Sequence, residues 1–287
     1  MKEEAGALCW ECVSPEWSMA VLFGASVCAG FLGALTGLGG GVVIVPTLMI
    51  AFGVDLHYAI GASLIAVIAT STGSAAAYVR DGFTNIRVGV LLEVATVVGA
   101  IAGAVLAAYL SGKVIVGLFV TALFYSAIAT LRPPKPHAVE TQPDKWATRL
   151  KLDGVYPTKE GMTAYRVRHV PGAFAIMIGA GALSAIVGIG SGIIKVLAMD
   201  RLMRLPFKVS TTTSNFMIGV TAAASCGVYL HRGQIEPQIA GPVALGALVG
   251  ALAGARVLPK IKTLWLRRIF AVVVIASGLE LVRRTFF

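Results

Sequence analysis

Charged residues are scarce in this chain of 287 residues, where Asp, Glu, Lys and Arg together make up 13%. A soluble domain carries about 25% charged residues, so this chain has too few to cover a surface that faces water. Hydrophobic residues reach 57%, and the mean hydropathy is +0.83. These values exclude a cytosolic globular enzyme, a disordered regulator and a secreted disulfide scaffold. We expect an all-α polytopic membrane protein with most of its length in lipid.

Motifs for enzymatic or metal chemistry are also missing. The sequence has no HExxH or GxSxG pattern, which speaks against an intramembrane enzyme. Cys9 and Cys12 form a lone CxxC, without the second pair of ligands that a zinc site needs. The apolar segments hold no His and Cys cluster that would make a path for a metal ion. We therefore expect no enzyme, no cofactor and no metal, and the role of the CxxC stays open.

Basic residues exceed acidic ones, with 24 Lys and Arg against 14 Asp and Glu and a formal net charge of +10. No run combines dense basic residues with interleaved aromatics, so we expect no nucleic-acid partner. Cytoplasmic loops of membrane proteins carry an excess of Lys and Arg. The positive charge therefore marks the cytoplasmic side of the chain.

Apolar stretches alternate with short polar turns. Eight are long enough to cross a hydrocarbon core, which needs about 20 helical residues, whereas 42–53 and 193–203 are too short and each follows a glycine cluster. We interpret each short stretch as the second arm of a broken helix or a helical hairpin. The ten stretches run approximately over 18–37, 42–53, 57–80, 87–110, 113–131, 171–188, 193–203, 207–230, 238–258 and 264–282.

One long polar stretch separates the apolar segments into two groups of five. It contains five prolines and eight Lys or Arg residues, so we expect it to be cytoplasmic. The same reasoning puts the basic turns at 80–87, 201–208 and 256–268 on that side and both termini outside. The predicted organisation is an outside tail over 1–17, a first membrane repeat over 18–131, a cytoplasmic loop over 132–170 and a second membrane repeat over 171–287.

The two halves match without a gap at an offset of 151 residues. Since each copy has five segments, eight full spans and two half-helices in all, the second copy enters the membrane from the opposite face. Inverted repeats with discontinuous helices are typical of transporters, whose sites lie near the midplane at the repeat interface. The matched pairs include Ala34 with Ala185, Gly41 with Gly192, Ser63 with Ser214, Thr70 with Thr221, and Tyr78 with Tyr229.

The two glycine breaks form the core of the predicted substrate site. Helix N-termini carry roughly half a positive charge and free N–H donors, and glycine lets these donors approach a ligand closely. The alternative is that the glycines only permit tight helix crossing. The candidate binding residues in the breaks are Gly39, Gly40, Gly41, Gly190, Ser191 and Gly192.

Polar side chains near the breaks extend this site. A lysine at mid-membrane, such as Lys195, requires a water-filled cavity, a carboxylate or an anionic ligand, unless it snorkels to an interface. Ser63, Ser214 and Asn215 offer neutral donors for the oxygens of a small oxyanion, or they bond neighbouring helices. Glu93 is the proton-coupling candidate, because it is the only carboxylate well inside a long span. It could instead pair with Lys195 or face a wet vestibule.

The first half reads Gly33-Ala-Leu-Thr-Gly-Leu-Gly-Gly-Gly-Val-Val-Ile-Val-Pro46, then Ala59-Ile-Gly-Ala-Ser63, then Tyr78-Val-Arg-Asp-Gly82. These motifs and their counterparts in the second half resemble the TauE/SafE sulfite exporter family, also called the toluene-sulfonate uptake permease family. The resemblance implies a bacterial or archaeal inner-membrane carrier of sulfite or organosulfonates. The second half departs from the pattern at Ser191, Leu197 and Lys195, which leaves the particular substrate open.

The predicted function is a secondary transporter that moves a small sulfur-containing anion across the inner membrane by alternating access. Proton coupling, the direction of transport and a homodimeric state remain open. The expected partners are a small anionic substrate and membrane lipid. The alternatives are a passive anion channel, a permease for a different small ion, and an assembly factor that docks through residues 132–170.

Overall fold

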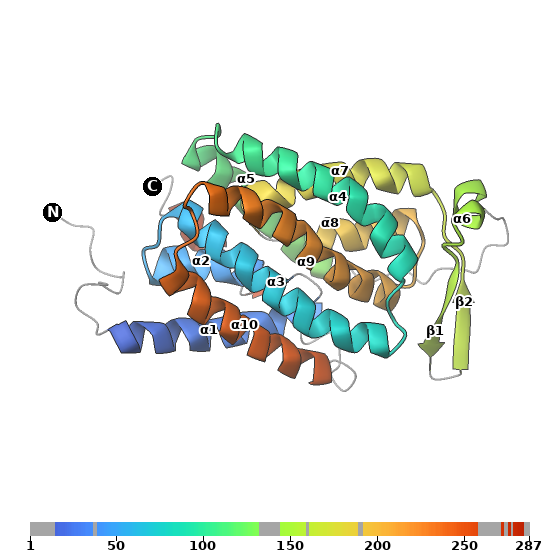
Figure 1. The fold of residues 1–287 in the computed structure, drawn as a ribbon, viewed down its shortest axis with the longest axis horizontal. Coiled ribbons are helices and arrows are strands. Elements are labelled where there is room, and N and C mark those ends of the chain that lie inside the picture. Colours follow the sequence, from blue (N-terminus) through green and yellow to red (C-terminus); the bar gives the residue numbers. More distant parts are fainter. Residues whose placement is uncertain are drawn as a thin grey trace.

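The structure is a computed structural model, and it describes residues 15–36, 39–131, 144–158, 161–188, 192–257, 271–272, 275–276 and 278–283. Helices dominate these residues (Figure 1). In chain order the elements are α1 (Pro15–Thr36), α2 (Gly41–Ala51), α3 (Leu56–Arg80), α4 (Ile86–Ala107), α5 (Gly112–Leu131), α6 (Lys145–Arg149), β1 (Gly154–Thr158), β2 (Gly161–Tyr165), α7 (Val170–Val187), α8 (Gly192–Leu197), the π-helix η1 (Ala198–Leu202), α9 (Phe207–His231) and α10 (Pro237–Val257).

Four of the described helices, α3, α4, α7 and α10, are long and apolar enough to cross a membrane. Helix α9 is as long as α3 but is not among them, because Lys208 and the polar run 210–215 occupy its first turns. The chain is thus a multi-pass membrane protein built mainly from helices, as predicted. The number of spans stays a prediction.

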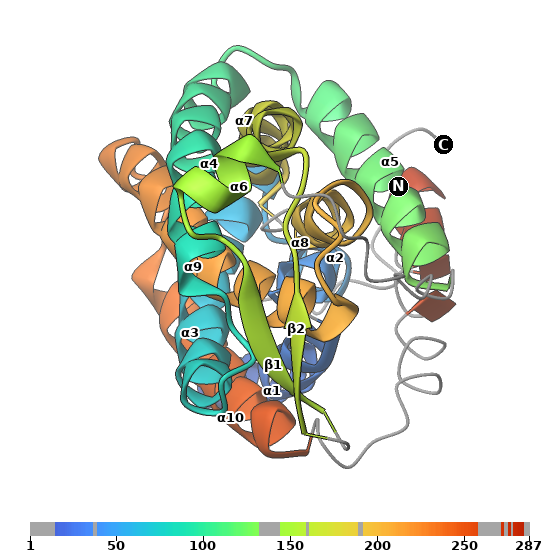
Figure 2. The same ribbon diagram turned by 90° about the vertical axis from the view of Figure 1, so that its right-hand side faces the viewer.

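The long helices pack in a continuous row. Helix α1 packs on α10, α10 on α3, α3 on α9, α9 on α4, and α4 on α7. Figures 1 and 2 show α3 and α9 in the middle of this row, with α1 and α10 on one side and α4 and α7 on the other. Helices α3 and α9, one from each half of the chain, therefore each contact a helix of the other half.

Glycines set the close approach of the outer helix pairs. A methyl group added at Gly99 on α4 would collide with the carbonyl oxygen of Ile178 on α7, and one added at Gly250 on α10 would collide with that of Val27 on α1. The second contact is the first displaced by 151 residues in both partners. Further pairs at the same displacement are Gly103 with Ala182 and Gly254 with Phe31, and Gly181 with Thr96 and Gly30 with Ala247.

The segment predicted as a polar loop contains secondary structure. Strands β1 and β2 form an antiparallel hairpin in which Gly154 pairs with Tyr165 and Thr158 with Gly161. The Asn85 amide, at the start of α4, donates to the Leu152 carbonyl oxygen and to the Tyr165 hydroxyl, both at 2.8 Å. Burial raises the pKa of Tyr165, so its hydroxyl stays protonated. The hairpin is thereby attached to the end of the bundle where α4 begins (Figure 1).

Two glycines on α7 provide a direct test of the helix packing. Gly181→Ala should destabilise the protein by about 1–3 kcal/mol, because the new methyl group forces α7 away from the Thr96 backbone. Gly179→Ala is the matched control, since nothing lies within 4 Å of its added methyl group. It should be neutral or stabilising by up to about 1 kcal/mol, because alanine favours a helix. Thermal unfolding in detergent would measure both, and equal effects would contradict this packing.

Candidate functional site

The chain breaks its helices at the two predicted glycine clusters. Helix α2 begins at Gly41, preceded by Gly39 and Gly40 with φ of +78° and +71°. Helix α7 ends before Gly188, where φ is +72°. Side chains rarely tolerate this left-handed conformation, so glycine is required at both turns. The second short arm starts at Gly192, and the predicted site residues Gly190 and Ser191 lie outside the described residues.

The two breaks contact each other, although they are about half the chain apart. A methyl group added at Gly41 would lie 2.8 Å from the Gly188 carbonyl oxygen and 2.7 Å from Ser63 Oγ. Ser63 Oγ in turn donates to the Gly188 carbonyl oxygen at 2.8 Å. The short helices α2 and α8 lie toward opposite ends of the bundle in Figure 1 and overlap in the end-on view of Figure 2. The breaks that precede them therefore adjoin at the centre.

Polar side chains donate hydrogen bonds to backbone carbonyls at the two breaks. Thr70 Oγ1 donates to the Gly39 carbonyl oxygen at 3.0 Å, and Ser214 Oγ donates to that of Gly192 at 3.2 Å. The Asn215 amide lies 3.5 Å from the carbonyl oxygen of Ala34. A hydroxyl has one proton to donate, so Ser63 and Ser214 must give up these bonds before they can donate to an anion.

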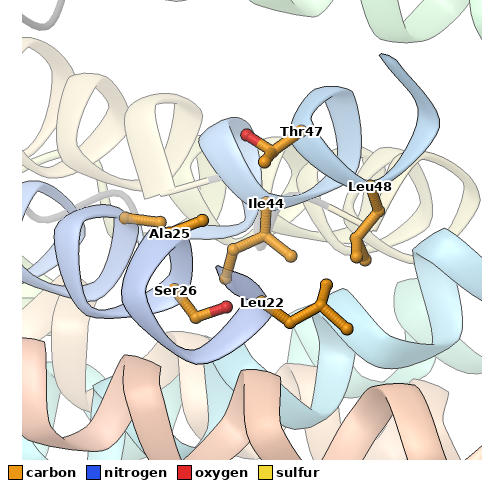
Figure 3. A pocket seen from close by; sticks show the side chains of 7 residues that line it. Leu22, Ala25, Ser26, Ile44, Thr47 and Leu48 are labelled. Carbon is orange, nitrogen blue, oxygen red and sulfur yellow. The ribbon is translucent and has the colours of Figure 1, made fainter. Parts of the chain in front are cut away.

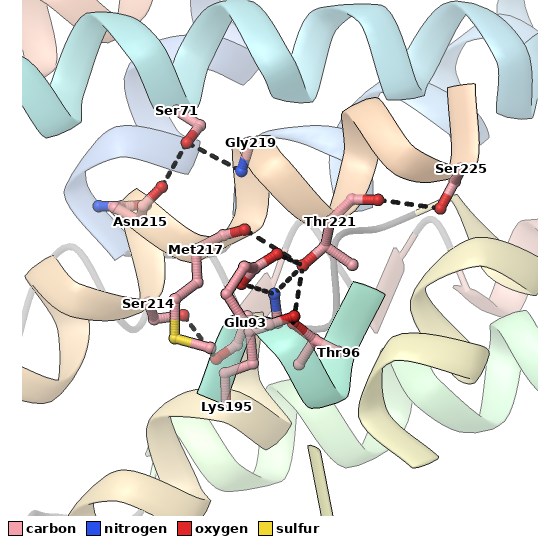
Figure 4. A network of polar contacts seen from close by, with 11 residues as sticks. Ser71, Glu93, Thr96, Lys195, Ser214, Asn215, Met217, Gly219, Thr221 and Ser225 are labelled. Atoms are coloured by element: carbon pink, nitrogen blue, oxygen red, sulfur yellow. Dashed lines mark hydrogen bonds and ion pairs between the residues drawn. The ribbon is translucent and has the colours of Figure 1, made fainter. Parts of the chain in front are cut away.

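A buried charged pair lies beside the second break. Lys195 on α8 has no solvent exposure, and Glu93 on α4 is 6% exposed. Their atoms Nζ and Oε2 are 3.7 Å apart. The Thr221 hydroxyl on α9 joins them, because it accepts from Lys195 Nζ and donates to Glu93 Oε1 at 2.6 Å (Figure 4). Thr96 adds a second hydroxyl, 3.3 Å from that of Thr221.

This network explains how a lysine is held away from water. Of the possible environments for Lys195, a carboxylate partner is the one present, and Glu93 pairs with it. At an effective dielectric constant of about 20, unit charges at this separation attract by roughly 4 kcal/mol. Desolvation of the two ions offsets much of that attraction. The pair therefore contributes little net stability, but either partner left alone would be strongly destabilising.

The matching position in the first half is apolar. At the offset of 151 residues, Ile44 corresponds to Lys195 and Ala244 to Glu93, whereas Thr70 corresponds to Thr221. Ile44 lines a small pocket between α1 and α2 (Figure 3). The full lining of that pocket is Leu22, Ala25, Ser26, Ala29, Ile44, Thr47 and Leu48. The two halves thus share the threonine and the glycine break, whereas each half contributes one member of the charged pair, and its counterpart in the other half is apolar.

Sequence reasoning did not select Thr221 and Thr96 as site residues. Thr221 was visible as the counterpart of Thr70 in the matched halves, but nothing local shows that it reaches Glu93, 128 residues away. Ser71 is a similar case, because its hydroxyl donates to the Asn215 carbonyl oxygen and accepts from the Gly219 amide at 3.0 Å. Both contacts depend on the crossing of α3 and α9.

The sequence matches the family model of the sulfite exporter TauE/SafE over residues 22–281. The chain belongs to this family. It is 26% identical over 277 residues to the probable membrane transporter protein YunE of Bacillus subtilis, a match that covers 94% of this chain and 99% of YunE. It is 25% identical over 273 residues to a probable membrane transporter protein of Xylella fastidiosa, covering 93% and 96% of the two chains.

A third relative is the probable membrane transporter protein YdhB of Bacillus subtilis, 25% identical over 245 residues, or 84% of this chain and 90% of YdhB. No solved structure matches the chain. The TauE/SafE match covers both glycine breaks and the Glu93–Thr221–Lys195 network. Family and relatives together support a membrane transporter rather than an enzyme.

Double substitution of the charged pair tests whether Lys195 and Glu93 compensate each other. Lys195→Met should destabilise the protein by about 3–5 kcal/mol, because it leaves a buried carboxylate without its counter-charge. Combining it with Glu93→Gln should recover much of that loss, since no net charge then remains inside. Chemical unfolding in detergent of both single variants and the double variant gives the coupling energy. Additive losses would show that the two side chains do not interact.

Proposed function

We propose that this protein is a secondary transporter of a small sulfur-containing anion, such as sulfite or an organosulfonate, and that it works by alternating access with proton coupling through Glu93. Membership of the sulfite exporter TauE/SafE family supports the substrate class. The observation that carries the proposal is Lys195, a buried cation one turn into the short helix α8, directly after a glycine break. Such a cation offers an anion both charge and hydrogen bonds.

The proposed architecture is a pair of inverted five-segment repeats. The recurrent glycine contacts support it, because α1 packs on α10 in the way that α7 packs on α4. The long-range bonds of Tyr78 to the Ala34 carbonyl oxygen and of Tyr229 to that of Ala185 have the same sequence separation of 44 residues. In this architecture the substrate site lies where the two breaks adjoin, between α3 and α9.

We also propose that the hairpin end of the bundle is cytoplasmic, that both termini are outside, and that the protein lies in a bacterial or archaeal inner membrane. Contacts of the hairpin segment support a common side for the basic turns. Asn85, in the turn between α3 and α4, bonds Leu152. The Arg168 amide donates to the Met203 carbonyl oxygen at 3.1 Å, in the turn that precedes α9. The positive-inside rule then assigns that side to the cytoplasm.

Transport measurements test the proposed function. Proteoliposomes containing the protein should accumulate radiolabelled sulfite or a labelled organosulfonate with saturable kinetics. Lys195→Met should lower the rate by at least about tenfold, because the loss of one charge-assisted contact is worth roughly 1.5–3 kcal/mol. Ser214→Ala should have a smaller effect, since its hydroxyl is bonded to the Gly192 backbone.

Lys113→Met is the matched control, because Lys113 is an exposed lysine at the start of α5. Its transport should equal that of the unmodified protein. The absence of saturable anion movement, or equal rates for Lys195→Met and Lys113→Met, would contradict the proposal. Flux far above the rates of a carrier would indicate a channel instead.

A further inference from the structure

The Glu93 carboxylate is only partly satisfied. Its Oε1 accepts the Thr221 proton, but its Oε2 makes no hydrogen bond within the described part of the chain. That oxygen faces Lys195 Nζ at 3.7 Å, so an anion that bound this cation would compete with it. The Glu93 carboxylate thus pairs with Lys195 as a bound oxyanion would, because it has two oxygens and one negative charge.

The net charge of this buried site limits which states of Glu93 can coexist with a bound anion. With Lys195 protonated and Glu93 ionised, the buried network is neutral. If an anion joined both, the site would hold one uncompensated negative charge away from water, which is strongly unfavourable. The site is neutral again if Glu93 is protonated while the anion binds Lys195.

We propose that Glu93 is a built-in competitor for the substrate anion at Lys195, and that it takes up one proton each time the anion binds. This inference rests on the proposed function. The proton comes from water on the side where the anion enters, and an O–H bond forms on Glu93 while Lys195 keeps all its protons. When the anion leaves on the other side, Glu93 releases that proton to water there and pairs with Lys195 again.

Few other groups could supply the proton, because the surrounding elements carry little charge. Helix α7 has no charged residue, and Lys195 is the only one in α8. Helix α9 has Lys208 in its first turn and His231 in its last, both remote from Thr221. Helix α4 adds Arg87, which is bonded to the Lys151 carbonyl oxygen, and η1 adds Asp200 and Arg201. Asp200 has a partner of its own.

One proton for each monovalent anion makes the transport cycle electroneutral. The second-half position corresponding to Glu93 is Ala244, so the scaffold offers one such carboxylate and the expected stoichiometry is one. Anion accumulation should then follow the pH gradient and ignore the membrane potential. An organosulfonate is the right probe, because it stays ionised at any working pH and cannot carry the proton itself.

The experiment measures accumulation of a labelled monovalent alkanesulfonate in proteoliposomes under imposed gradients. For the unmodified protein, one pH unit, acidic outside, should raise the accumulation ratio about tenfold, and a potential of about 100 mV should leave it unchanged. Glu93→Gln should still carry the anion, more slowly, and respond in the opposite way. The accumulation ratio of this variant should not depend on pH. It should change roughly fifty-fold at a membrane potential of about 100 mV, because the anion then crosses the membrane without a proton and carries one net charge.

Asp81→Asn is the control, since Asp81 is an exposed carboxylate paired with Arg80 at the end of α3. It should behave like the unmodified protein. Sulfonate transport by the unmodified protein that follows the potential and ignores pH would overturn the inference while leaving the proposed function intact. Unchanged proton coupling in Glu93→Gln would also overturn it. No saturable movement of either sulfite or sulfonate would remove both.

A second measurement needs no variant, in case Glu93→Gln does not fold. Sulfonate added to the purified protein in weakly buffered detergent solution should cause uptake of one proton per bound anion, read from a pH indicator. Binding without proton uptake would overturn the inference, although it would agree with anion transport.

Discussion

A charge that is sealed from water needs a counter-charge inside the protein, and Lys195 imposes that demand on the centre of this fold. Three elements meet it together: α8 carries the lysine, α4 brings Glu93, and α9 brings the Thr221 hydroxyl between them. Because these residues come from both halves of the chain, the network forms only when α4, α8 and α9 are packed together. The network therefore fixes the position of the short helix α8 relative to the long helices α4 and α9.

The two helix breaks also need partners inside the protein, because they place backbone polar groups away from water. Carbonyl groups freed at a helix break inside a membrane need partners from the protein or from water, and Thr70, Ser63 and Ser214 provide them from α3 and α9. The same central helices thus serve the breaks and the charged pair. A ligand that took hydrogen bonds from one set would change the environment of the other, and in the proposed transporter this would couple a bound anion to helix movement.

The lengths of the apolar segments and the positions of the glycine clusters predicted much of this fold. The glycine clusters located both breaks, and the short arms begin within a residue of the predicted starts at 42 and 193. A lysine inside the membrane needs a counter-charge, an anionic ligand or water, so the sequence predicted only a few possible partners for Lys195, and Glu93 was one of them. The bridging role of Thr221 depends on a helix crossing, which no local pattern encodes. The pairing of β1 with β2 was not predicted, because the contact of Tyr165 with Asn85 is long-range and the sequence of this segment is typical of a polar loop.

The most direct test of the account is an experimental structure with a bound sulfonate that carries a heavy atom, since anomalous scattering locates such a ligand. The account predicts the sulfonate oxygens within hydrogen-bond distance of Lys195 Nζ, with Glu93 moved off the lysine. An anion bound elsewhere, with Lys195, Thr221 and Glu93 still joined as in Figure 4, would contradict it.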